Sequence, residues 1–474
     1  MRNLHHHYIG GARVEGDKSR AHAVVNPATE QVCAEVRLGT ERDVNAAVSA
    51  AIAARDKFAA TIKEERFALL QAILGEYAKR RDELAAVITE EMGCPISLSK
   101  AAQAAVGMAH LQATTAALQT FSFEQQQGRS RLVFEPVGVA ALITPWNWPI
   151  NQIVAKVAAA IAAGCTMVLK PSEVAPGNAV IFAEIMHAAG VPAGIFNLVN
   201  GDGPVVGEAL ARHPDVDMVS FTGSTRAGVL VAKNAAATVK RVHQELGGKS
   251  PNVILRGADL TQAVTAGIRV LMMNSGQSCN APSRMLVPAE LHEQATAIAA
   301  SVANAIQVGD PAQEGSHIGP LANSNQYLKV KALIAQAVDA GARLAAGGAE
   351  RPASMARGFY IRPTVFAGVA NSMQIAREEI FGPVLCVIPY QDEAEAVQIA
   401  NDTPYGLAAH VWASSHDAAL PVARRLRAGS IHINGASVDF SMPFGGFKQS
   451  GNGREFGAHG IKEFLEAKAI MTPA

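Results

Sequence analysis

Between residues 137 and 236, short apolar runs alternate with segments of helical periodicity, and only brief turns separate them. The pattern predicts strands at 137–143, 166–170, 194–199 and 216–221, and helices at 149–163, 176–189, 204–212 and 224–236. Strands and helices that alternate in this way form a parallel sheet covered by helices on both faces. The sequence therefore predicts an α/β fold around a doubly wound parallel sheet.

The flanking regions extend this architecture. Residues 41–120 place apolar side chains at helical spacing, and a second alternating series begins at Pro251, with Cys279 near its start. A chain of 474 residues is also too long for one ordinary hydrophobic core. We expect at least two domains.

Composition excludes several classes of protein. Hydrophobic residues make up 49% of the chain and charged residues 17%, which is typical of a compact globular protein. Lysine plus arginine equals aspartate plus glutamate at 41 each, so no net charge attracts nucleic acid or an anionic membrane. We expect neither as a partner.

Cysteine usage and apolar runs bear on location. The five cysteines are an odd number, widely spaced and without a C-x-x-C pair, which argues against a disulfide framework or a zinc site and for a reducing compartment. The first residues lack the apolar stretch of a signal peptide, and the alanine-rich run 157–163 is too short to cross a bilayer. These features predict a cytoplasmic protein without a metal site.

Cys279 and Glu245 are candidate catalytic residues. Cys279 lies in the segment 276–284 (Gly-Gln-Ser-Cys-Asn-Ala-Pro-Ser-Arg), and Glu245 opens the segment 245–249 (Glu-Leu-Gly-Gly-Lys). A thiol attacks well only as a thiolate, and a nearby carboxylate could accept a proton from the thiol or later from water. The alternative is that Cys279 is a buried core cysteine, which is where most free cysteines lie. The flanking residues must decide between the two.

The turns that follow the predicted strands are candidate ligand sites, because ligands of such sheets bind beyond the carboxyl ends of the strands. In 221–225 (Phe-Thr-Gly-Ser-Thr) a helix begins directly after a strand, and its free N–H groups could bind phosphate. Ser224 or Thr225 could equally be a simple N-cap. The segment 201–207 resembles the dinucleotide fingerprint but has one residue too many before its third glycine.

A third turn, 170–173 (Lys-Pro-Ser-Glu), closes a strand with a base and an acid. A carboxylate at this place can accept hydrogen bonds from both ribose hydroxyls of NAD and would repel the 2′-phosphate of NADP. Alternatively, the two side chains form an ordinary surface ion pair. Because several such turns lie on one sheet, a nucleotide cofactor is the leading hypothesis.

Over nearly its whole length the chain resembles the aldehyde dehydrogenase superfamily. The blocks that carry the resemblance follow in the family's order, and they are 144–149 (Thr-Pro-Trp-Asn-Trp-Pro), 170–173, 221–224, 245–249, 276–284, 378–384 (Glu-Glu-Ile-Phe-Gly-Pro-Val) and 443–448 (Pro-Phe-Gly-Gly-Phe-Lys). The resemblance implies NAD-dependent oxidation of an aldehyde to a carboxylic acid.

The resemblance also implies catalytic roles. Cys279 would add to the aldehyde carbonyl and later carry a thioester, while the Asn147 amide and the backbone N–H of Cys279 would form the oxyanion hole. Glu245 would activate the water that releases the acid. Lys156 and Glu455 match a pair thought to relay the proton outward.

For the cofactor, the resemblance implies that Lys170 and Glu173 bind ribose and that Ser224 contacts the pyrophosphate. Glu173 favours NAD over NADP. The other residues expected to line the cofactor groove are Ile143, Trp146, Gly203, Gly223, Leu246, Gln326, Glu379 and Phe381.

Trp148 and Phe444 are expected to flank the substrate tunnel. Along the helix after Trp148, Gln152 and Ala155 stand where many relatives have larger side chains, which predicts a tunnel open to bulky or longer apolar aldehydes (terpenoid, aromatic or chain-extended). Phe440 could refill that space. The other expected tunnel residues are Ser278 and Asn280.

Some neighbouring residues are interpreted as structural. Lys249 is predicted to form a packing ion pair, and His243 to be an ordinary strand residue. The segment 444–446 is predicted to be a turn at the funnel.

Four other functions remain open. A semialdehyde dehydrogenase of a catabolic pathway would use the same residues. A CoA-acylating relative would have no use for a water-activating acid such as Glu245, and a non-catalytic relative would not need Cys279, Asn147 and Glu245 together. A cofactor-independent cysteine hydrolase would need a histidine base and would leave the nucleotide turns unused.

The family's architecture implies three units. Residues 1–117 and 137–247 would form the NAD-binding domain of Rossmann type, and 248–461 the catalytic domain. Residues 118–136 and 462–474 would form a β-hairpin oligomerisation arm that joins a neighbouring subunit's sheet, since an isolated two-stranded arm is unstable. We expect a homo-oligomer, a dimer or a dimer of dimers (a homotetramer).

Overall fold

The structure is a computed structural model, and it describes residues 1–473. Its first large sheet has eight strands in the order β22-β12-β11-β8-β9-β10-β2-β3. The central strands are parallel, and they are β8 (Val139–Ile143), β9 (Thr166–Lys170), β10 (Phe196–Leu198), β11 (Met218–Thr222) and β12 (Arg241–Glu245). The predicted α/β fold is confirmed, and the four predicted strands are present within about two residues of each expected boundary.

Antiparallel strands close both edges of this sheet. At one edge lie β2 (His6–Ile9) and β3 (Ala12–Glu15), and at the other lies β22 (Gly451–Asn452), which pairs with β12. The β22 pairing places a segment from near the end of the chain directly beside Glu245.

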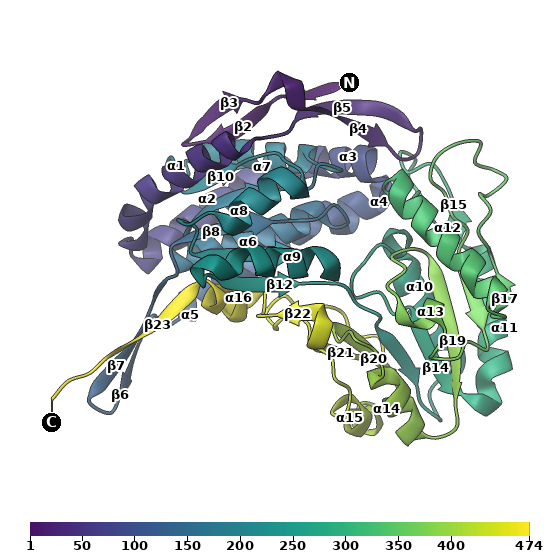
Figure 1. Cartoon of the computed structure of the whole chain (residues 1–474). Coiled ribbons are helices and arrows are strands. Elements are labelled where there is room, and N and C mark those ends of the chain that lie inside the picture. Colours follow the sequence, from purple (N-terminus) through teal and green to yellow (C-terminus); the bar gives the residue numbers. More distant parts are fainter. Residues whose placement is uncertain (474) are drawn as a thin grey trace.

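Helices cover both faces of the first sheet (Figure 1). The alternation of side chains along the strands explains how: Ala140 and Leu142 face one core with α6 (Pro149–Ala163) and α7 (Gly177–Ala188), whereas Val139 and Ala141 face another with α1 (Glu41–Ala59). The predicted helix at 204–212 differs in detail, because its first turn, Gly203–Gly207, is π-helical and only Glu208–Arg212 (α8) is α-helical. The helix α9 (Thr225–Ala235) follows β11.

The predicted helical region 41–120 is confirmed. It holds α1 (Glu41–Ala59), α2 (Lys63–Lys79), α3 (Arg81–Met92), α4 (Ile96–Leu98), the π-helical η2 (Ser99–Gln103) and α5 (Ala104–Thr120). A capping box between Thr40 and Asp43 begins α1. A small sheet of β1 (Arg2–Leu4), β5 (Gln31–Arg37) and β4 (Ala21–Asn26) lies above these helices in Figure 1.

The second large sheet has seven strands in the order β17-β18-β19-β14-β13-β20-β21, and only β17 is antiparallel to its neighbour. Its strands are β13 (Pro251–Ile254), β14 (Arg284–Pro288), β17 (Arg343–Ala346), β18 (Thr364–Ala367), β19 (Val384–Tyr390), β20 (Ala408–Trp412) and β21 (Ser430–Ile433). This sheet is the second alternating series predicted from Pro251 onward.

Helices also pack on both faces of the second sheet. The helices α10 (Leu260–Met272) and α11 (His292–Ala305) share a core with Met285 and Val287 of β14. The other face packs against α12 (Ser324–Asp339), α14 (Glu393–Asn401) and α15 (His416–Ala423). Cys279 lies between the short helix Met273–Gly276 and the start of β14.

A third sheet projects from the body as an arm (Figure 1). It consists of β6 (Glu124–Gln127), β7 (Ser130–Pro136) and β23 (Leu465–Ile470) in the order β23-β7-β6. The projecting segment is shorter than 118–136, because residues 118–120 end α5 and the rings of Phe121, Phe123 and Phe134 pack together beside the core. The strand β6 is exposed along its whole length.

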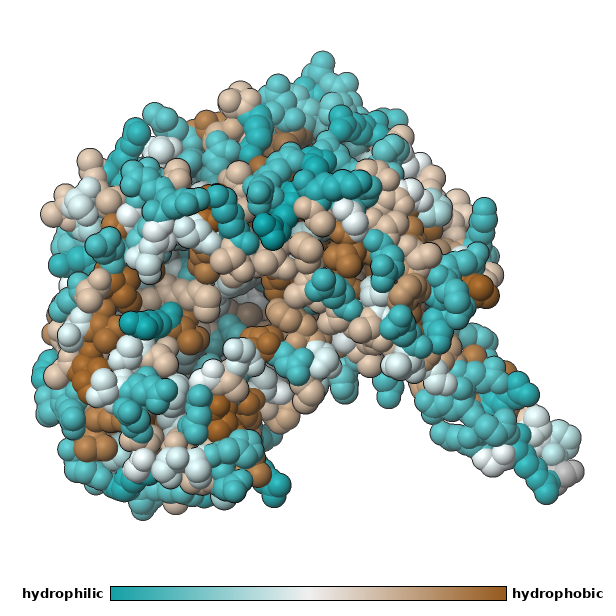
Figure 2. All heavy atoms as spheres, turned by 180° about the vertical axis from the view of Figure 1, so that it is seen from behind, coloured by the Kyte–Doolittle hydropathy of each residue, from teal (hydrophilic) through white to brown (hydrophobic). Residues whose placement is uncertain are grey.

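The outer face of the molecule is mixed in character. Figure 2, which views the chain from behind, shows a mainly hydrophilic arm and a surface that is hollowed near its middle. Within residues 1–473, none of the helices is both long and apolar enough to cross a membrane.

Candidate active site

The candidate site lies where the carboxyl ends of the first sheet meet the start of the second. Asn147 follows β8, Glu245 ends β12, and Cys279 precedes β14. A cavity of about 200 Å³ brings them together. The other predicted residues that line it are Trp146, Gln152, Gly223, Ser224, Leu246, Gln326, Glu379 and Phe381.

Cys279 differs from the other cysteines of the chain. It is partly exposed, whereas Cys33, Cys94, Cys165 and Cys386 are buried and fit the interpretation as core cysteines. Burial, followed by the charges of Glu379 and Glu245, raises the pKa of the Cys279 thiol well above its ordinary value. In the resting site the thiol is therefore protonated and needs a proton acceptor before it can attack.

Asn147 is held by a buried network that the sequence did not reveal. Its Nδ2 donates to the Gln277 carbonyl at 3.1 Å, and its Oδ1 accepts from Gln152 Nε2 at 3.1 Å. Its backbone carbonyl accepts from Gln103 Nε2 at 3.1 Å and Asn274 Nδ2 at 2.9 Å. One N–H of the Asn147 amide therefore remains to be donated into the cavity beside Cys279.

The loop before Cys279 has a strained backbone. Asn274 and Ser275 both have positive φ angles, 54° and 56°, which L residues adopt at a cost of about 1–3 kcal/mol each. The hydrogen bonds of the Asn274 side chain and the bond from Ser275 Oγ to the Gly319 carbonyl hold this loop. Strain of this kind is typical of functional sites.

Gln152 differs from its expected place. The sequence predicted a tunnel side chain, but its amide is buried against Asn147, and its Oε1 has no hydrogen-bond partner. It reaches the same cavity as Cys279 and Asn147. It therefore orients the Asn147 amide rather than only shaping a tunnel.

Glu245 is buried at the end of β12. Its Oε1 lies 3.4 Å from His243 Nε2, and its Oε2 has no hydrogen-bond partner. Burial, followed by the charge of Glu455, raises the pKa of Glu245 well above its ordinary value. The interpretation of His243 as an ordinary strand residue is therefore incomplete, because its ring contacts the candidate base.

Lys156 and Glu455 form a buried ion pair behind Glu245, with 2.6 Å between Nζ and Oε1. Lys156 Nζ also donates to Ser220 Oγ at 2.9 Å. Although burial alone would raise the pKa of Glu455, Lys156 lowers it below the ordinary value. The structure thus brings together the two residues that the resemblance paired.

The proposed ribose residues lie together at the end of β9. Lys170 Nζ is 3.5 Å from Glu173 Oε2, and Lys170 is buried while the Glu173 side chain is 30% exposed. Burial lowers the pKa of Lys170. Ile143 ends the neighbouring strand β8 and pairs with Lys170 across the sheet. Glu173 can therefore accept hydrogen bonds from a ligand while Lys170 holds it in place.

The start of α9 tests the two interpretations of Ser224. Its Oγ accepts from the Ala227 N–H at 3.3 Å, so Ser224 is an N-cap, and Thr225 is the first helical residue. Beside it, the hydroxyl of Thr222 is buried without a partner. The remaining N–H groups of this first turn still face the cavity end of the sheet and suit a phosphate.

Gly223 and Gly203 differ in how much space their surroundings leave for a side chain. A side chain at Gly223 would collide with the ring of Phe221, at 2.5 Å from its Cζ. At Gly203 a Cβ would have open space, so nothing in the protein itself requires glycine there. Asp202, just before it, accepts from the Val205 N–H and pairs with Arg20 at 2.6 Å.

The remaining cofactor candidates form one side of the cavity. Gln326 Nε2 donates to the carbonyls of Ile380 and Phe381 at 2.9 and 2.8 Å, so it holds this loop and its amide N–H groups face the protein. Phe381 has a positive φ of 58°, and its ring meets Trp146 edge-on at 5.5 Å between centroids. Glu379 Oε1 accepts from the Gly248 N–H at 3.0 Å.

The expected tunnel residues lie around aromatic rings. Trp148 Nε1 donates to Ser278 Oγ at 2.8 Å, next to Cys279 and Asn280. The Phe444 ring stacks on Phe456 at 5.0 Å. None of Trp148, Ser278, Asn280 and Phe444 lines the cavity that holds Cys279 and Glu245.

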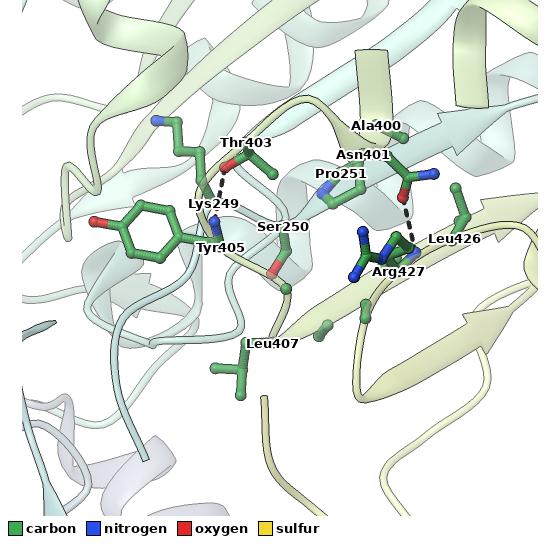
Figure 3. A pocket seen from close by; sticks show the side chains of 14 residues that line it. Lys249, Ser250, Pro251, Ala400, Asn401, Thr403, Tyr405, Leu407, Leu426 and Arg427 are labelled. Atoms are coloured by element: carbon green, nitrogen blue, oxygen red, sulfur yellow. Dashed lines mark hydrogen bonds between the residues drawn. The ribbon is translucent and has the colours of Figure 1, made fainter. Parts of the chain in front are cut away.

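Lys249 does not form the predicted ion pair. Its Nζ is buried without a hydrogen-bond partner, and burial lowers its pKa to about 8. Figure 3 shows the side chain beside Thr403, extending away from Asn401 and Arg427. The prediction is wrong because the Glu379 carboxyl, whose charge acts on Lys249, accepts a hydrogen bond from the Gly248 N–H instead.

Comparison with known proteins decides the family. The model of the aldehyde dehydrogenase family matches residues 14–470. The chain belongs to the aldehyde dehydrogenase family. It is 53% identical over 472 residues to a 3-succinoylsemialdehyde-pyridine dehydrogenase of a Pseudomonas species, with 99% of each chain covered.

Solved aldehyde dehydrogenases share the whole fold. Aldehyde dehydrogenase C of Pseudomonas syringae, in a complex with NAD⁺ and octanal, is 50% identical with a TM-score of 0.98, covering 99% of this chain and 98% of that one. The Mycobacterium tuberculosis enzyme with NAD⁺ is 36% identical with a TM-score of 0.97, covering 100% and 99%. The resemblance predicted from the sequence blocks is confirmed, and with it the aldehyde dehydrogenase fold.

The positions of potential metal ligands in the described residues bear on metal binding. Among residues 1–473 of this aldehyde dehydrogenase, no three His, Cys, Asp or Glu side chains lie together as a metal site.

Proposed function

We propose that this aldehyde dehydrogenase oxidises an aldehyde to a carboxylic acid with NAD, through a covalent intermediate on Cys279. The observation that carries the proposal is the cavity that Cys279 shares with Asn147 and Glu245, beside the start of α9. A cysteine hydrolase would need a histidine base beside the thiol, whereas the charges that act most strongly on Cys279 are the carboxyls of Glu379 and Glu245.

In the first half-reaction, the Cys279 sulfur forms a bond to the aldehyde carbon while its proton passes to solvent in the cavity, which leaves Glu245 unprotonated for the second half-reaction. The carbonyl oxygen becomes an oxyanion, which the free N–H of Asn147 and the backbone N–H of Cys279 stabilise. NAD⁺, held in the groove by Glu173, Lys170 and the start of α9, would accept the hydride that leaves the aldehyde carbon as the carbonyl re-forms. The carbon then remains bound to Cys279 as a thioester.

In the second half-reaction, Glu245 takes a proton from water as the water oxygen forms a bond to the thioester carbon. The same two donors stabilise the new oxyanion. When the bond from carbon to sulfur breaks, the carboxylic acid leaves, and Glu245 passes the proton it took from water to the Cys279 sulfur. Lys156 and Glu455 lie behind Glu245 and set the electrostatic potential there.

The residues of the groove fit NAD. Glu173 offers a partly exposed carboxylate beside Lys170, and the buried, unpartnered hydroxyl of Thr222 lies beside the N-terminus of α9. An acid at the ribose position favours NAD over NADP. The solved relatives from P. syringae and M. tuberculosis were crystallised with NAD⁺, which supports the same assignment.

For the substrate, we propose bulky or longer apolar aldehydes. An aromatic cluster in the segment expected to flank the tunnel supports it, because the rings of Phe440, Phe444 and Phe456 pack together there. The octanal complex of the P. syringae enzyme supports a long apolar chain. The second candidate is a semialdehyde that carries an aromatic ring, and the 53% identical relative supports it.

Absorbance of NADH, followed with a panel of aldehydes, tests the proposal. We expect octanal and benzaldehyde to give kcat/KM values at least about tenfold above that of acetaldehyde, because each further buried methylene contributes about 0.8 kcal/mol. A preference for acetaldehyde would refute the apolar substrate class. A preference for succinic semialdehyde over octanal would favour a carboxylated substrate, and a requirement for CoA would show a CoA-acylating enzyme.

For the assembly, we propose a homo-oligomer, a dimer or a dimer of dimers. The projecting arm supports it, because the exposed strand β6 leaves a row of backbone groups unpaired. We also propose the predicted division into an NAD-binding domain (1–117 and 137–247), an arm (118–136 and 462–474) and a catalytic domain (248–461), with residues 118–120 of the arm range ending α5. A cytoplasmic location agrees with five cysteines that are all free.

A further inference from the structure

A line of buried polar groups connects Glu245 to the ion pair behind it. Lys156 Nζ donates to Ser220 Oγ at 2.9 Å, Ser220 Oγ lies 3.0 Å from His243 Nδ1, and His243 Nε2 lies 3.4 Å from Glu245 Oε1. Ser220 and His243 are neighbours across the β11–β12 pairing. All of these side chains are nearly inaccessible to solvent.

The ammonium group of Lys156 sets the direction of every hydrogen bond in this line. Because Lys156 has only protons to offer, Ser220 Oγ must accept from it, and the hydroxyl proton of Ser220 is then free for His243 Nδ1. A neutral imidazole that accepts at Nδ1 carries its proton on Nε2. That N–H then points at Glu245 Oε1.

We propose that His243 is the positioning residue of the general base: through Ser220 and Lys156 it is held as the Nε2–H tautomer, and it donates to Oε1 of Glu245. The inference rests on the proposed role of Glu245 in the second half-reaction. With Oε1 engaged, the unpartnered Oε2 is the oxygen that accepts the proton of the attacking water.

Packing leaves the two side chains little freedom. A Cβ at Gly453 would lie 2.3 Å from Cδ2 of the His243 ring, and a Cβ at Gly445 would lie 2.7 Å from Oε1 of Glu245. Both glycines have positive φ angles, 77° and 152°. The backbone at Gly445 and Gly453 therefore packs directly against the carboxylate and the ring and restricts their movement.

The hydrogen bond from His243 to Glu245 counteracts the effect of burial on the pKa of Glu245. Burial raises the pKa of Glu245 and so lowers the fraction of Glu245 that is present as the carboxylate. A hydrogen bond donated to the carboxylate lowers that pKa. Burial and Lys156 lower the pKa of His243 to about 3, so the ring stays neutral. The charged or titratable groups that face this pair are Lys156, Arg454, Glu455, Glu463 and Cys279.

Two substitutions of His243 distinguish its hydrogen bond to Glu245 from its hydrogen bond to Ser220. In His243→Gln the amide can reach the place of Nε2 and donate to Glu245, whereas in His243→Asn it reaches only the place of Nδ1 and contacts Ser220. We expect His243→Gln to stay within about threefold of the wild-type kcat. We expect His243→Asn to lower kcat about 10- to 100-fold, the usual effect of losing a hydrogen bond to a charged group.

The measurements distinguish positioning from a purely structural role. For His243→Asn we expect a full first-turnover burst of NADH before the slow phase, and an upward shift of about one unit or more in the acidic limb of the kcat–pH profile. Ser220→Ala should shift the same limb less. If burst and steady-state rate fall in proportion, or if the two His243 variants are equally slow, the proposal is overturned.

Glu245→Gln separates this inference from the proposed function. A burst followed by little turnover is expected in that variant. If Glu245→Gln turns over at the wild-type rate, the assignment of the base fails. If Glu245→Gln behaves as expected while His243→Asn keeps the wild-type kcat and pH profile, only the role of His243 is refuted.

Discussion

Asn147 offers the sharpest test of the oxyanion hole. The substitution Asn147→Ala removes one donor that is free to face the developing oxyanion and leaves the backbone N–H of Cys279 in place. Its amide makes hydrogen bonds to Gln277 and Gln152.

The expected loss can be worked out from these contacts. Removal of one oxyanion donor typically lowers kcat about 10²- to 10³-fold, or about 2.7–4 kcal/mol. The Gln277 carbonyl keeps its hydrogen bond from Asn274 at 3.2 Å, but Gln152 Nε2 loses its acceptor in a buried site. The folded state should therefore lose about 1–3 kcal/mol, which leaves it folded.

Steady-state NADH formation with octanal measures the first effect, and urea unfolding measures the second. The matched control is Gln152→Ala, which loosens the amide of Asn147 without removing its donor, and it should lower kcat less than about tenfold. If Asn147→Ala keeps more than about a tenth of the wild-type kcat, the free N–H does not stabilise the oxyanion. Equal losses in the two variants would show that orientation alone matters.

Other substitutions test the remaining parts of the site. Cys279→Ala should abolish both NADH formation and hydrolysis of p-nitrophenyl esters, and any remaining esterase activity would indicate another nucleophile. Glu173→Gln should raise the ratio of kcat/KM for NADP to that for NAD at least about tenfold, because a carboxylate no longer faces the 2′-phosphate; an unchanged ratio would move the discrimination elsewhere. Burial lowers the pKa of His110 from 6.5 to about 4. Between these values the unfolded chain binds more protons, so the His110 contribution to the free energy of unfolding should fall by up to about 3 kcal/mol as pH drops from 7 to 4. Urea unfolding across that range should show a smaller fall in His110→Gln, and an equal fall would refute this account.

The sequence predicted what depends on local pattern. Apolar runs and glycine-ended turns placed the strands β8, β9, β10 and β11 and the helices α6, α7 and α9 within about two residues, because each pattern reports burial of nearby side chains. The helix Pro149–Ala163 is the clearest case, with proline at its first position and Gly164 in the left-handed conformation after its end.

The sequence did not reveal what depends on contacts between distant segments. Gln103 lies 44 residues from Asn147 and 171 from Asn274, yet all of these side chains meet around one carbonyl. No spacing along the chain reports such a meeting. The same reason explains Lys249, whose predicted ion pair is absent. The contact of His243 with Glu245 could have been predicted, because residues two apart on a strand lie on the same face.

The two buried carboxyls of the site favour different protonation states. Lys156 lies 2.6 Å from Glu455 and lowers its pKa, whereas burial and the charge of Glu455 raise the pKa of Glu245. Environments that separate two carboxyls in this way assign their roles, since the group with the raised pKa is the one that changes its proton during turnover. A proton on Glu245 would have to move uphill to reach Glu455. We therefore propose Glu455 as the ion-pair partner that holds Lys156 in place, while Lys156 orients the hydrogen bonds that end at Glu245.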